Sequence, residues 1–267
     1  MRKAVLFLFL AFLLPSTWQN ISSSVPKPMS FDVLSSDVNT TKIKFTMDGF
    51  HLIPSSDSKS ISYKVRSENG ASILNQGYPD LHNISKSIII PDQSKTSVNV
   101  VSFKYEDYEN IFVVPSKGNL NREINPKDVP LQYSDIYKSN EFYPASISEL
   151  SDPYILRDLR GQTISINPFQ YNAVTRTLRV YSEVILEVVS SALSTNNAVE
   201  RIGSSIKLSS NYDEIYKDHF INYNNDTRFE YFIDQGNMLV ICNDAFMNEM
   251  VPFVDWKNRK GVPTELV

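Results

Sequence analysis

The side chains best suited to chemistry are one thiol, Cys242, and three imidazoles, His51, His82 and His219. A cysteine can act as a nucleophile when a base takes its proton, and histidine can supply that base or bind a metal. The histidines are scattered singly without metal-ligand spacing, and none is close to Cys242 in sequence. We interpret Cys242 as a small buried hydrophobic side chain and the histidines as surface or structural residues. The pattern predicts no catalytic residue, cofactor or metal site in this chain.

Three basic side chains, Lys117, Arg122 and Lys127, lie in a long polar segment, residues 115–144, between predicted strands. Long loops of this kind are uncommon in compact domains and are often functional. We interpret the segment as a loop that can reach into the cleft of a partner, with one basic side chain making the contact. A loop that only faces solvent would explain the same residues.

The overall composition excludes several classes of protein. With 26 basic and 30 acidic residues, the net charge is -4, and no block of Lys or Arg occurs, so we expect no nucleic-acid partner. A single cysteine cannot form an intrachain disulfide or a thiolate zinc site. The hydrophobic content of 42% is enough for one large or two modest domains that are stabilised by packing.

The amino-terminal segment, residues 1–20, has the features of a secretory signal peptide. Arg2 and Lys3 precede an apolar run from Ala4 to Leu14, which Pro15 ends. The run is shorter than the roughly 20 apolar residues that a spanning helix needs. We therefore predict that this segment directs export and is removed, although no clear cleavage motif marks its end. We predict no other transmembrane segment.

The next segment, residues 25–189, has the pattern of an all-β domain. Short runs of alternating apolar and polar residues are separated by turn formers, as at residues 42–47, 60–65 and 97–103. The longest run covers residues 177–189, where Leu178, Val180, Val184, Leu186 and Val188 would share a buried face, while Arg179, Tyr181, Glu183 and Glu187 would face water. We expect residues 163–168 to form a hairpin with this strand through a turn at residues 171–174. The sequence predicts an immunoglobulin-like β-sandwich.

A Ser- and Asn-rich segment, residues 190–236, is predicted to be an exposed linker with about one helical turn near residues 213–217. Basic residues in an exposed linker are accessible to a trypsin-like protease. We take Lys217 and Arg228 as candidate maturation sites, with Arg201 and Lys207 as further basic residues of the segment. A plain solvated linker is the alternative for each.

The final segment, residues 237–267, has the pattern of one β-α-β unit. A continuous apolar run at residues 238–242 is typical of a parallel strand buried on both faces. Asn243 and Asp244 can cap the following helix, which Pro252 would kink or begin. Residues 262–267 then start a second strand. One such unit cannot bury its own faces, so we expect it to be the truncated start of a larger α/β domain.

Several segments together resemble the gingipain family of cysteine peptidases. Residues 153–161, 166–172 and 178–181 are similar to the end of the gingipain pro-domain. Residues 238–241 and 253–264 are similar to the opening strand, helix and second strand of its caspase-like catalytic domain. The resemblance extends from about Thr41 onward and is most specific from Pro153.

The resemblance implies a pro-domain that keeps a cysteine endopeptidase latent during bacterial export and is cut away to release activity on proteins. The partner of the pro-domain would then be its own catalytic domain, and the product would be secreted or held at the cell surface. Lys117, Arg122 and Lys127 become candidates for an inhibitory contact. The family's catalytic Cys and His belong to later strands, so no catalytic residue is carried over, and calcium would belong to the complete catalytic domain.

Two other functions remain open at this point. A related sortase-like transpeptidase of type IX secretion would use the same nucleophile for transfer in place of hydrolysis. A non-enzymatic secreted β-sandwich that binds a partner would need no catalytic domain.

Overall fold

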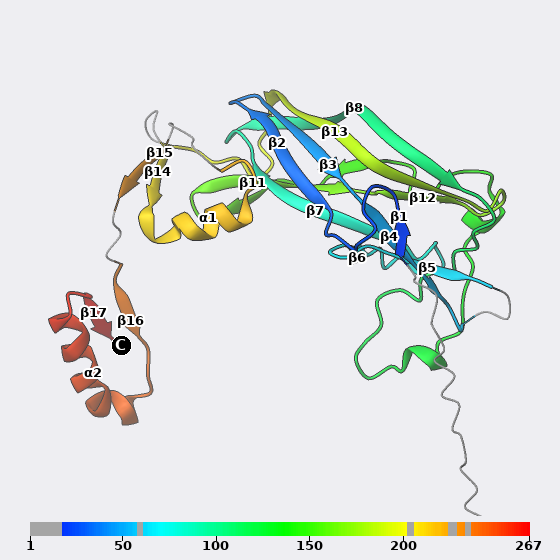
Figure 1. Cartoon of the computed structure of the whole chain (residues 1–267). Coiled ribbons are helices and arrows are strands. Elements are labelled where there is room, and N and C mark those ends of the chain that lie inside the picture. The colour runs from blue at the N-terminus through cyan, green and yellow to red at the C-terminus, as the bar shows by residue number, and fades with distance from the viewer. Residues whose placement is uncertain (1–17, 58–60, 202–205, 224–228, 233–235) are drawn as a thin grey trace, which may run out of the picture.

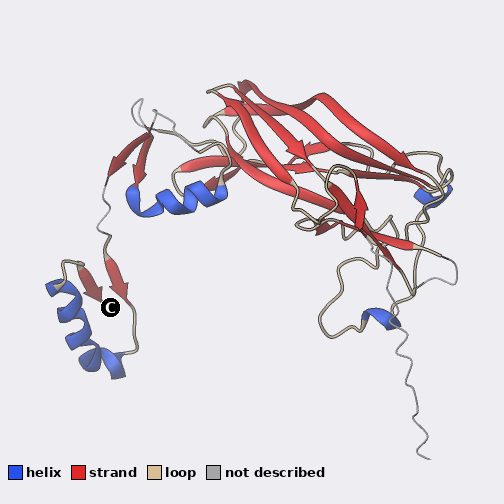
Figure 2. Ribbon diagram, in the orientation of Figure 1, coloured by secondary structure: helices blue, strands red, loops and turns tan. Residues whose placement is uncertain are grey.

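The computed structural model describes residues 18–57, 61–201, 206–223, 229–232 and 236–267. Most of the regular secondary structure consists of antiparallel strands (Figures 1 and 2), and the predicted mainly β fold is confirmed. The predicted signal peptide falls largely on residues 1–17, which lie outside the described residues. Its last three predicted residues form β1 (Trp18–Asn20), which pairs with β4 (Gly49–Pro54).

Two larger sheets pack face to face and a third, smaller sheet adjoins them. The first sheet comprises β2 (Ser30–Ser36), β3 (Thr40–Thr46), β8 (Ser94–Tyr108), β12 (Phe169–Asn172) and β13 (Thr177–Leu193). The second comprises β6 (Ala71–Ser72), β7 (His82–Ile89), β9 (Ser148–Leu150), β10 (Tyr154–Leu156) and β11 (Leu159–Ile166). The third comprises β1, β4 and β5 (Tyr63–Arg66).

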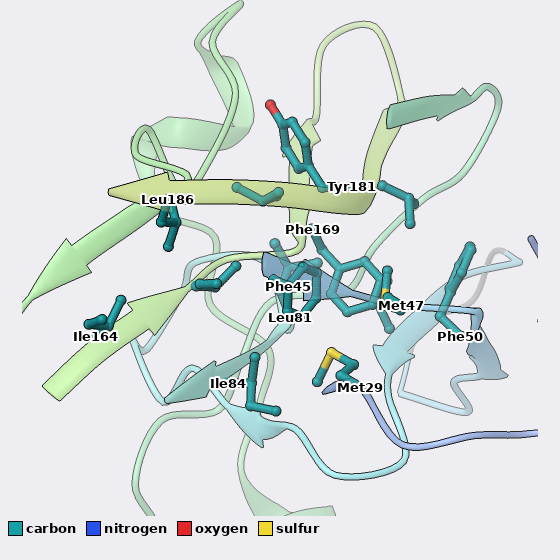
Figure 3. Close-up of a cluster of buried hydrophobic side chains, with 14 of the residues drawn as sticks. Met29, Phe45, Met47, Phe50, Leu81, Ile84, Ile164, Phe169, Tyr181 and Leu186 are labelled. Carbon is teal, nitrogen blue, oxygen red and sulfur yellow. The ribbon is translucent and has the colours of Figure 1, made fainter. Parts of the chain in front are cut away.

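The main hydrophobic core lies between the two larger sheets. Phe45 of β3 and Ile164 of β11 are fully buried and belong to one contiguous cluster. Phe169 and Leu186 join them from the first sheet, and Figure 3 shows these side chains directed toward one another. Burial of apolar side chains from both sheets is what holds a sandwich together.

Strand β13 confirms the predicted buried face and corrects the outer one. Leu178, Val180, Val184, Leu186 and Val188 are all buried. Tyr181, which was expected to face water, is only 3% exposed. Its side chain stays on the outer face, directed away from Leu186 in Figure 3, and is covered there by Phe103 and Tyr105 of β8, with ring centroids 5.6 and 5.8 Å from its own. Its hydroxyl donates a 2.7 Å hydrogen bond to Gln170 Oε1, which satisfies the buried phenol.

The predicted hairpin partner of β13 is wrong. Residues 163–166 belong to β11, which pairs with β7 in the second sheet. The chain then crosses at Asn167 and Pro168 to the first sheet, where β12 forms the hairpin with β13. Proline lacks a backbone donor and favours such a break between strands.

The prediction of an exposed linker over residues 190–236 is also wrong for much of its length. Strand β13 continues to Leu193, and β14 (Ile206–Ser209), a 3₁₀ turn (Ser210–Tyr212), α1 (Asp213–His219) and β15 (Phe229–Phe232) follow. These elements enclose a second core of six buried side chains, which are Leu159, Leu208, Tyr216, Phe220, Tyr223 and Phe229. The segment is therefore folded against β10 and β11.

The final residues form the predicted parallel β-α-β unit. Strands β16 (Met238–Val240) and β17 (Thr264–Leu266) pair in parallel on either side of a 3₁₀ turn (Asp244–Phe246) and α2 (Met247–Arg259). Asn243 accepts a hydrogen bond from the amide of Ala245 as the predicted cap, and Pro252 lies inside α2. The strand expected to be buried is open here, since Leu239 is 56% and Ile241 76% exposed.

Within the described residues, no helix combines the length and apolar character needed to cross a membrane.

Candidate inhibitory loop and maturation region

The candidate inhibitory loop leaves the third sheet after a pair of β-bridges and returns at β9. Val113 bridges Tyr63 of β5, and Pro115 bridges Pro79. The amide of Ser116 donates to the carbonyl of Tyr78 at 2.7 Å, and Gly77 donates to the carbonyl of Ser116 at 2.9 Å. The base of the loop is therefore fixed to the sandwich by backbone contacts. Beyond it, two 3₁₀ turns (Pro126–Asp128 and Asp135–Lys138) are the only regular elements of the described loop.

Lys117 lies at the base of the loop and is held in place. Its ammonium contacts Asp57 Oδ1 at 2.8 Å and donates to the carbonyl of Pro126 at 2.7 Å. Only 13% of its side chain is exposed. The hydrogen bond from Lys117, together with Lys64 on the other carboxylate oxygen, lowers the pKa of Asp57 despite its partial burial. Lys117 thus ties the stretch of the loop around Pro126 back to the base of the loop.

Arg122 lies at the exposed outer part of the same loop. Asn121 accepts a hydrogen bond from the amide of Glu123, which forms a local turn around Arg122. Within the part of the chain that the structure describes, no carboxylate pairs with Arg122. Its guanidinium is available to a partner.

Lys127 is also exposed, but it lies inside a 3₁₀ turn. The side chain of Asn125 accepts the amide of Lys127 at 3.1 Å and caps that turn. The three basic residues are therefore not equivalent: Lys117 anchors the loop, Lys127 belongs to a capped turn and Arg122 projects from the outer part.

Of the two candidate maturation sites, the structure describes only Lys217. Lys217 lies within α1, where its ammonium pairs with Asp213 four residues earlier. This contact raises the pKa of Lys217 and lowers the pKa of Asp213. A helical peptide bond must unwind before a protease can bind it as an extended strand. Arg228 lies outside the described residues.

Helix α1 is fixed to the second sheet by aromatic and polar contacts. The hydroxyl of Tyr216 donates to Asp158 at 2.7 Å, and burial raises the pKa of that phenol. The hydroxyl of Tyr154 lies 2.7 Å from His219 Nε2, and the Tyr154 ring stacks on Phe220. The helix therefore sits on β10 and β11 as part of the domain.

The connection between β13 and β14 is held by two arginines, Arg160, for which the sequence indicated no role, and Arg201, which was expected to lie exposed in a linker. Arg160 is fully buried and donates to the carbonyls of Pro91, Ser94, Asn196 and Asn197. Arg201 forms a two-point contact with the carboxylate of Asp92 at 2.6 and 3.0 Å. Burial of the whole guanidinium is possible because every carbonyl it meets accepts a hydrogen bond.

Sequence reasoning missed the second core, although one signal was present. Tyr216, Phe220 and Tyr223 place three large apolar side chains within eight residues, although only Tyr216 lies in α1. The surrounding Ser and Asn residues obscured that pattern.

Cys242 and the histidines keep structural contacts. Cys242 is partly buried, with Sγ 3.4 Å from Met247 Sδ. His51 Nε2 lies 2.6 Å from Glu68, and His82 Nδ1 accepts the amide of Ser67 at 3.1 Å. Burial lowers the pKa of His82 to about 4. Among the residues that the structure describes, no group of three or more His, Cys, Asp or Glu side chains could hold a metal ion.

The chain thus forms a two-sheet sandwich with a long loop at residues 115–144 and with helix α1 docked on the second sheet, and its class is that of a propeptide. The Propeptide_C25 family model matches residues 24–227, more than half of the chain, and the chain belongs to this gingipain propeptide family.

Comparison with individual proteins agrees with the family. Gingipain R2 of Porphyromonas gingivalis is 34% identical over 236 residues, which cover 88% of this chain and 32% of the relative. Gingipain R1 of the same species is 33% identical over 233 residues, which cover 87% of this chain and 23% of the relative. The chain thus spans a third or less of the length of these relatives.

Two solved structures share the fold. One is the complex of the Porphyromonas gingivalis RgpB pro- and mature domains, with a TM-score of 0.66 at 33% identity, covering 73% of this chain and 98% of the matched chain. The other concerns the zymogenic latency of gingipain K from Porphyromonas gingivalis, with a TM-score of 0.55 at 19% identity, covering 66% of this chain and 99% of the matched chain. The second likeness shows the fold alone.

Proposed function

We propose that this chain is the amino-terminal part of a gingipain-like cysteine endopeptidase precursor, whose sandwich keeps the catalytic domain latent until the connection between them is cut. The observation that carries the proposal is the match to the RgpB pro-domain, which extends over 98% of a chain solved in complex with its mature domain. The partner of the sandwich is then its own catalytic domain, and proteins are the substrates of the mature enzyme. Calcium would belong to the complete catalytic domain.

The amino-terminal signal supports a secreted or cell-surface location for the precursor. Its basic start and short apolar run are those of an export signal, and the relatives are bacterial. Latency has a physical purpose in that setting, because an active peptidase would damage the exporting cell.

We assign the inhibitory contact to Arg122. Its side chain is exposed at the outer part of the loop, whereas the ammonium of Lys117 is already used by Asp57 and the carbonyl of Pro126. A planar guanidinium suits a pocket that binds an arginine side chain through a carboxylate. Lys117 then acts as the anchor that positions the loop.

We assign the maturation cut to Arg228 over Lys217. Lys217 lies in a helix that is packed on the second sheet, and its ammonium pairs with Asp213. Arg228 follows directly after the residues that the family model matches.

The assignment to Arg122 is tested in the precursor that carries this chain together with its catalytic domain. Peptidase activity is measured before and after processing for the wild type and for Arg122→Ala, Lys127→Ala and Lys117→Ala. We expect Arg122→Ala to raise the activity of the unprocessed precursor at least tenfold and Lys127→Ala to leave it within twofold. Activity after processing should be equal in all four, which serves as the control for folding of the enzyme.

Equal latency in the wild type and Arg122→Ala would refute the role of Arg122. An unprocessed wild-type precursor that is fully active would refute the pro-domain function itself.

A further inference from the structure

Strand β15 lies immediately beyond the residues that the family model matches, yet it completes the second core. The family match ends at residue 227, and β15 covers Phe229–Phe232. Phe229 is only 8% exposed and belongs to the same buried cluster as Leu208 and Tyr216. In the ribbon of Figure 1, β15 runs beside β14 next to α1. A strand on the far side of the proposed cut is therefore built into the pro-domain.

The contacts of β15 with β14 and Tyr223 have the features of a specific binding site. Strands β14 and β15 pair in parallel over four residues, with Ile206 opposite Phe229 and Leu208 opposite Tyr231. The ring of Phe229 stacks on Tyr223, with centroids 5.5 Å apart and an interplanar angle of 21°. This combination of backbone pairing and one buried aromatic anchor is how a sheet edge binds an extended peptide.

A chain of hydrogen bonds adds a polar contact between β15 and the residues that precede the proposed cut. The hydroxyl of Tyr223 donates to Asp213 Oδ1 at 2.8 Å and lies 2.9 Å from the hydroxyl of Tyr231. The single phenolic proton of Tyr223 is used on Asp213, so Tyr231 is the donor to Tyr223. Residues 213, 223 and 231 are thus linked, two on one side of the proposed cut and one on the other.

The part of this binding site that carries Tyr223 is attached to the sandwich by contacts that do not involve β15. Helix α1 is fixed by the contacts of Tyr216 with Asp158 and of His219 with Tyr154. Ile221 donates its amide to the carbonyl of Ser87 at 3.0 Å, and Asn222 bonds both the amide and the carbonyl of Ile89. Tyr223 follows directly and is placed by this attachment to β7.

We propose that β14 and the ring of Tyr223 form a binding site for the amino-terminal segment of the mature chain, residues 229–232. The site is occupied in the uncut chain and keeps its occupant after the chain is cut between Tyr223 and Phe229. This rests on the proposed function, in which that connection is the maturation region. Cleavage then produces a two-part complex, and separation of β15 from β14 is a distinct step that follows it.

The test uses the full chain with the recognition sequence of a site-specific protease placed between Tyr223 and Phe229, and an affinity tag at the carboxyl end. After complete cleavage under native conditions, the tagged part is immobilised and the release of the untagged part is followed with time. We expect the wild-type parts to stay together through repeated washing.

Two variants of β15 provide the matched comparison. Phe229 is buried and Phe232 is 43% exposed on the same strand, and both lie on the part that leaves. Neither substitution therefore alters the released sandwich. We expect Phe229→Ser to speed dissociation at least tenfold and Phe232→Ser to change it by less than twofold.

Immediate separation of the wild-type parts would overturn the proposal, as would equal dissociation of the two variants. Either result leaves the latency of the uncut precursor unaffected. A precursor that is active before the cut would instead refute the proposed function.

Discussion

The ammonium of Lys117 lies 2.8 Å from Asp57 Oδ1, and this contact joins the long loop to the segment that follows β4. The same ammonium donates to the carbonyl of Pro126, so one side chain closes a stretch of loop that contains Arg122. Because both partners are largely shielded from solvent, the contact is stronger than an exposed ion pair. The position of the proposed inhibitory side chain thus depends on a residue that does not itself reach the partner.

Replacement of Lys117 should loosen the loop. We expect Lys117→Met to lower the free energy of unfolding by about 1.5 to 3 kcal/mol, since the variant leaves a partly buried carboxylate without its closest donor. Urea unfolding at neutral pH measures this change. Arg122→Met is the matched control and should alter stability by less than about 0.5 kcal/mol, because Arg122 is exposed. Equal stability of both variants would contradict an anchoring role.

His82 should make the stability of the domain depend on pH. Its pKa is lowered from 6.5 to about 4, chiefly by burial, so the folded state holds a neutral ring while the unfolded chain binds a proton below pH 6.5. The stabilisation is complete above pH 6.5 and is lost as the pH falls toward 4, with a slope of at most about 1.4 kcal/mol per pH unit.

His82→Asn isolates this effect from that of the carboxylates. The side-chain oxygen of Asn can accept the amide of Ser67, which His82 Nδ1 accepts in the wild type. We expect the free energy of unfolding of the wild type to fall by about 3 kcal/mol more than that of the variant between pH 6.5 and 4. Parallel curves for the two proteins would contradict the assignment.

Arg160 should be among the most sensitive positions of the chain. Arg160→Leu removes the donors for four backbone carbonyls, and we expect it to cost at least about 3 kcal/mol in urea unfolding. Arg160→Lys should also destabilise, because one ammonium cannot reproduce the fork of a guanidinium. Lys138→Leu, where the side chain is 81% exposed, serves as the control and should change stability by less than about 0.5 kcal/mol. A cost for Arg160→Leu as small as that of the control would contradict the role of Arg160.

Gly161 should control the docking of α1. A Cβ at this position would lie 2.6 Å from Phe220 Cε1 and 2.7 Å from Tyr154 Cζ, too close for either ring to remain in place. We expect Gly161→Ala to destabilise by about 1 to 3 kcal/mol and to raise the rate of amide hydrogen exchange in α1.

Ser165→Ala on the same strand is the control for Gly161→Ala. It replaces a side chain whose hydroxyl bonds that of Ser85 on the opposite strand. Exchange in α1 should match the wild type in this variant, and faster exchange would point to a general weakening of β11 in place of a local clash.

The sequence alone was enough to predict the elements in which apolar residues recur at a regular spacing. In residues 177–189, apolar side chains at every second position identified the buried face of β13, because a pleated strand turns alternate residues to the same side. The order of strand, helix and strand near the carboxyl end likewise predicted a parallel pair, since two consecutive parallel strands require a crossover.

Only the tertiary structure decided which outward-facing side chains are covered and which distant segments meet. Tyr181 is buried on the outer face because Phe103 and Tyr105 cover it, and these residues lie more than 70 positions earlier in the sequence. Residues 206–223 and 229–232 are folded because Tyr216, Phe220 and Phe229 find apolar surface on a sheet formed much earlier in the chain. The sequence of one segment does not show which distant surface will pack against it. The Ser- and Asn-rich segment was therefore predicted to be a linker.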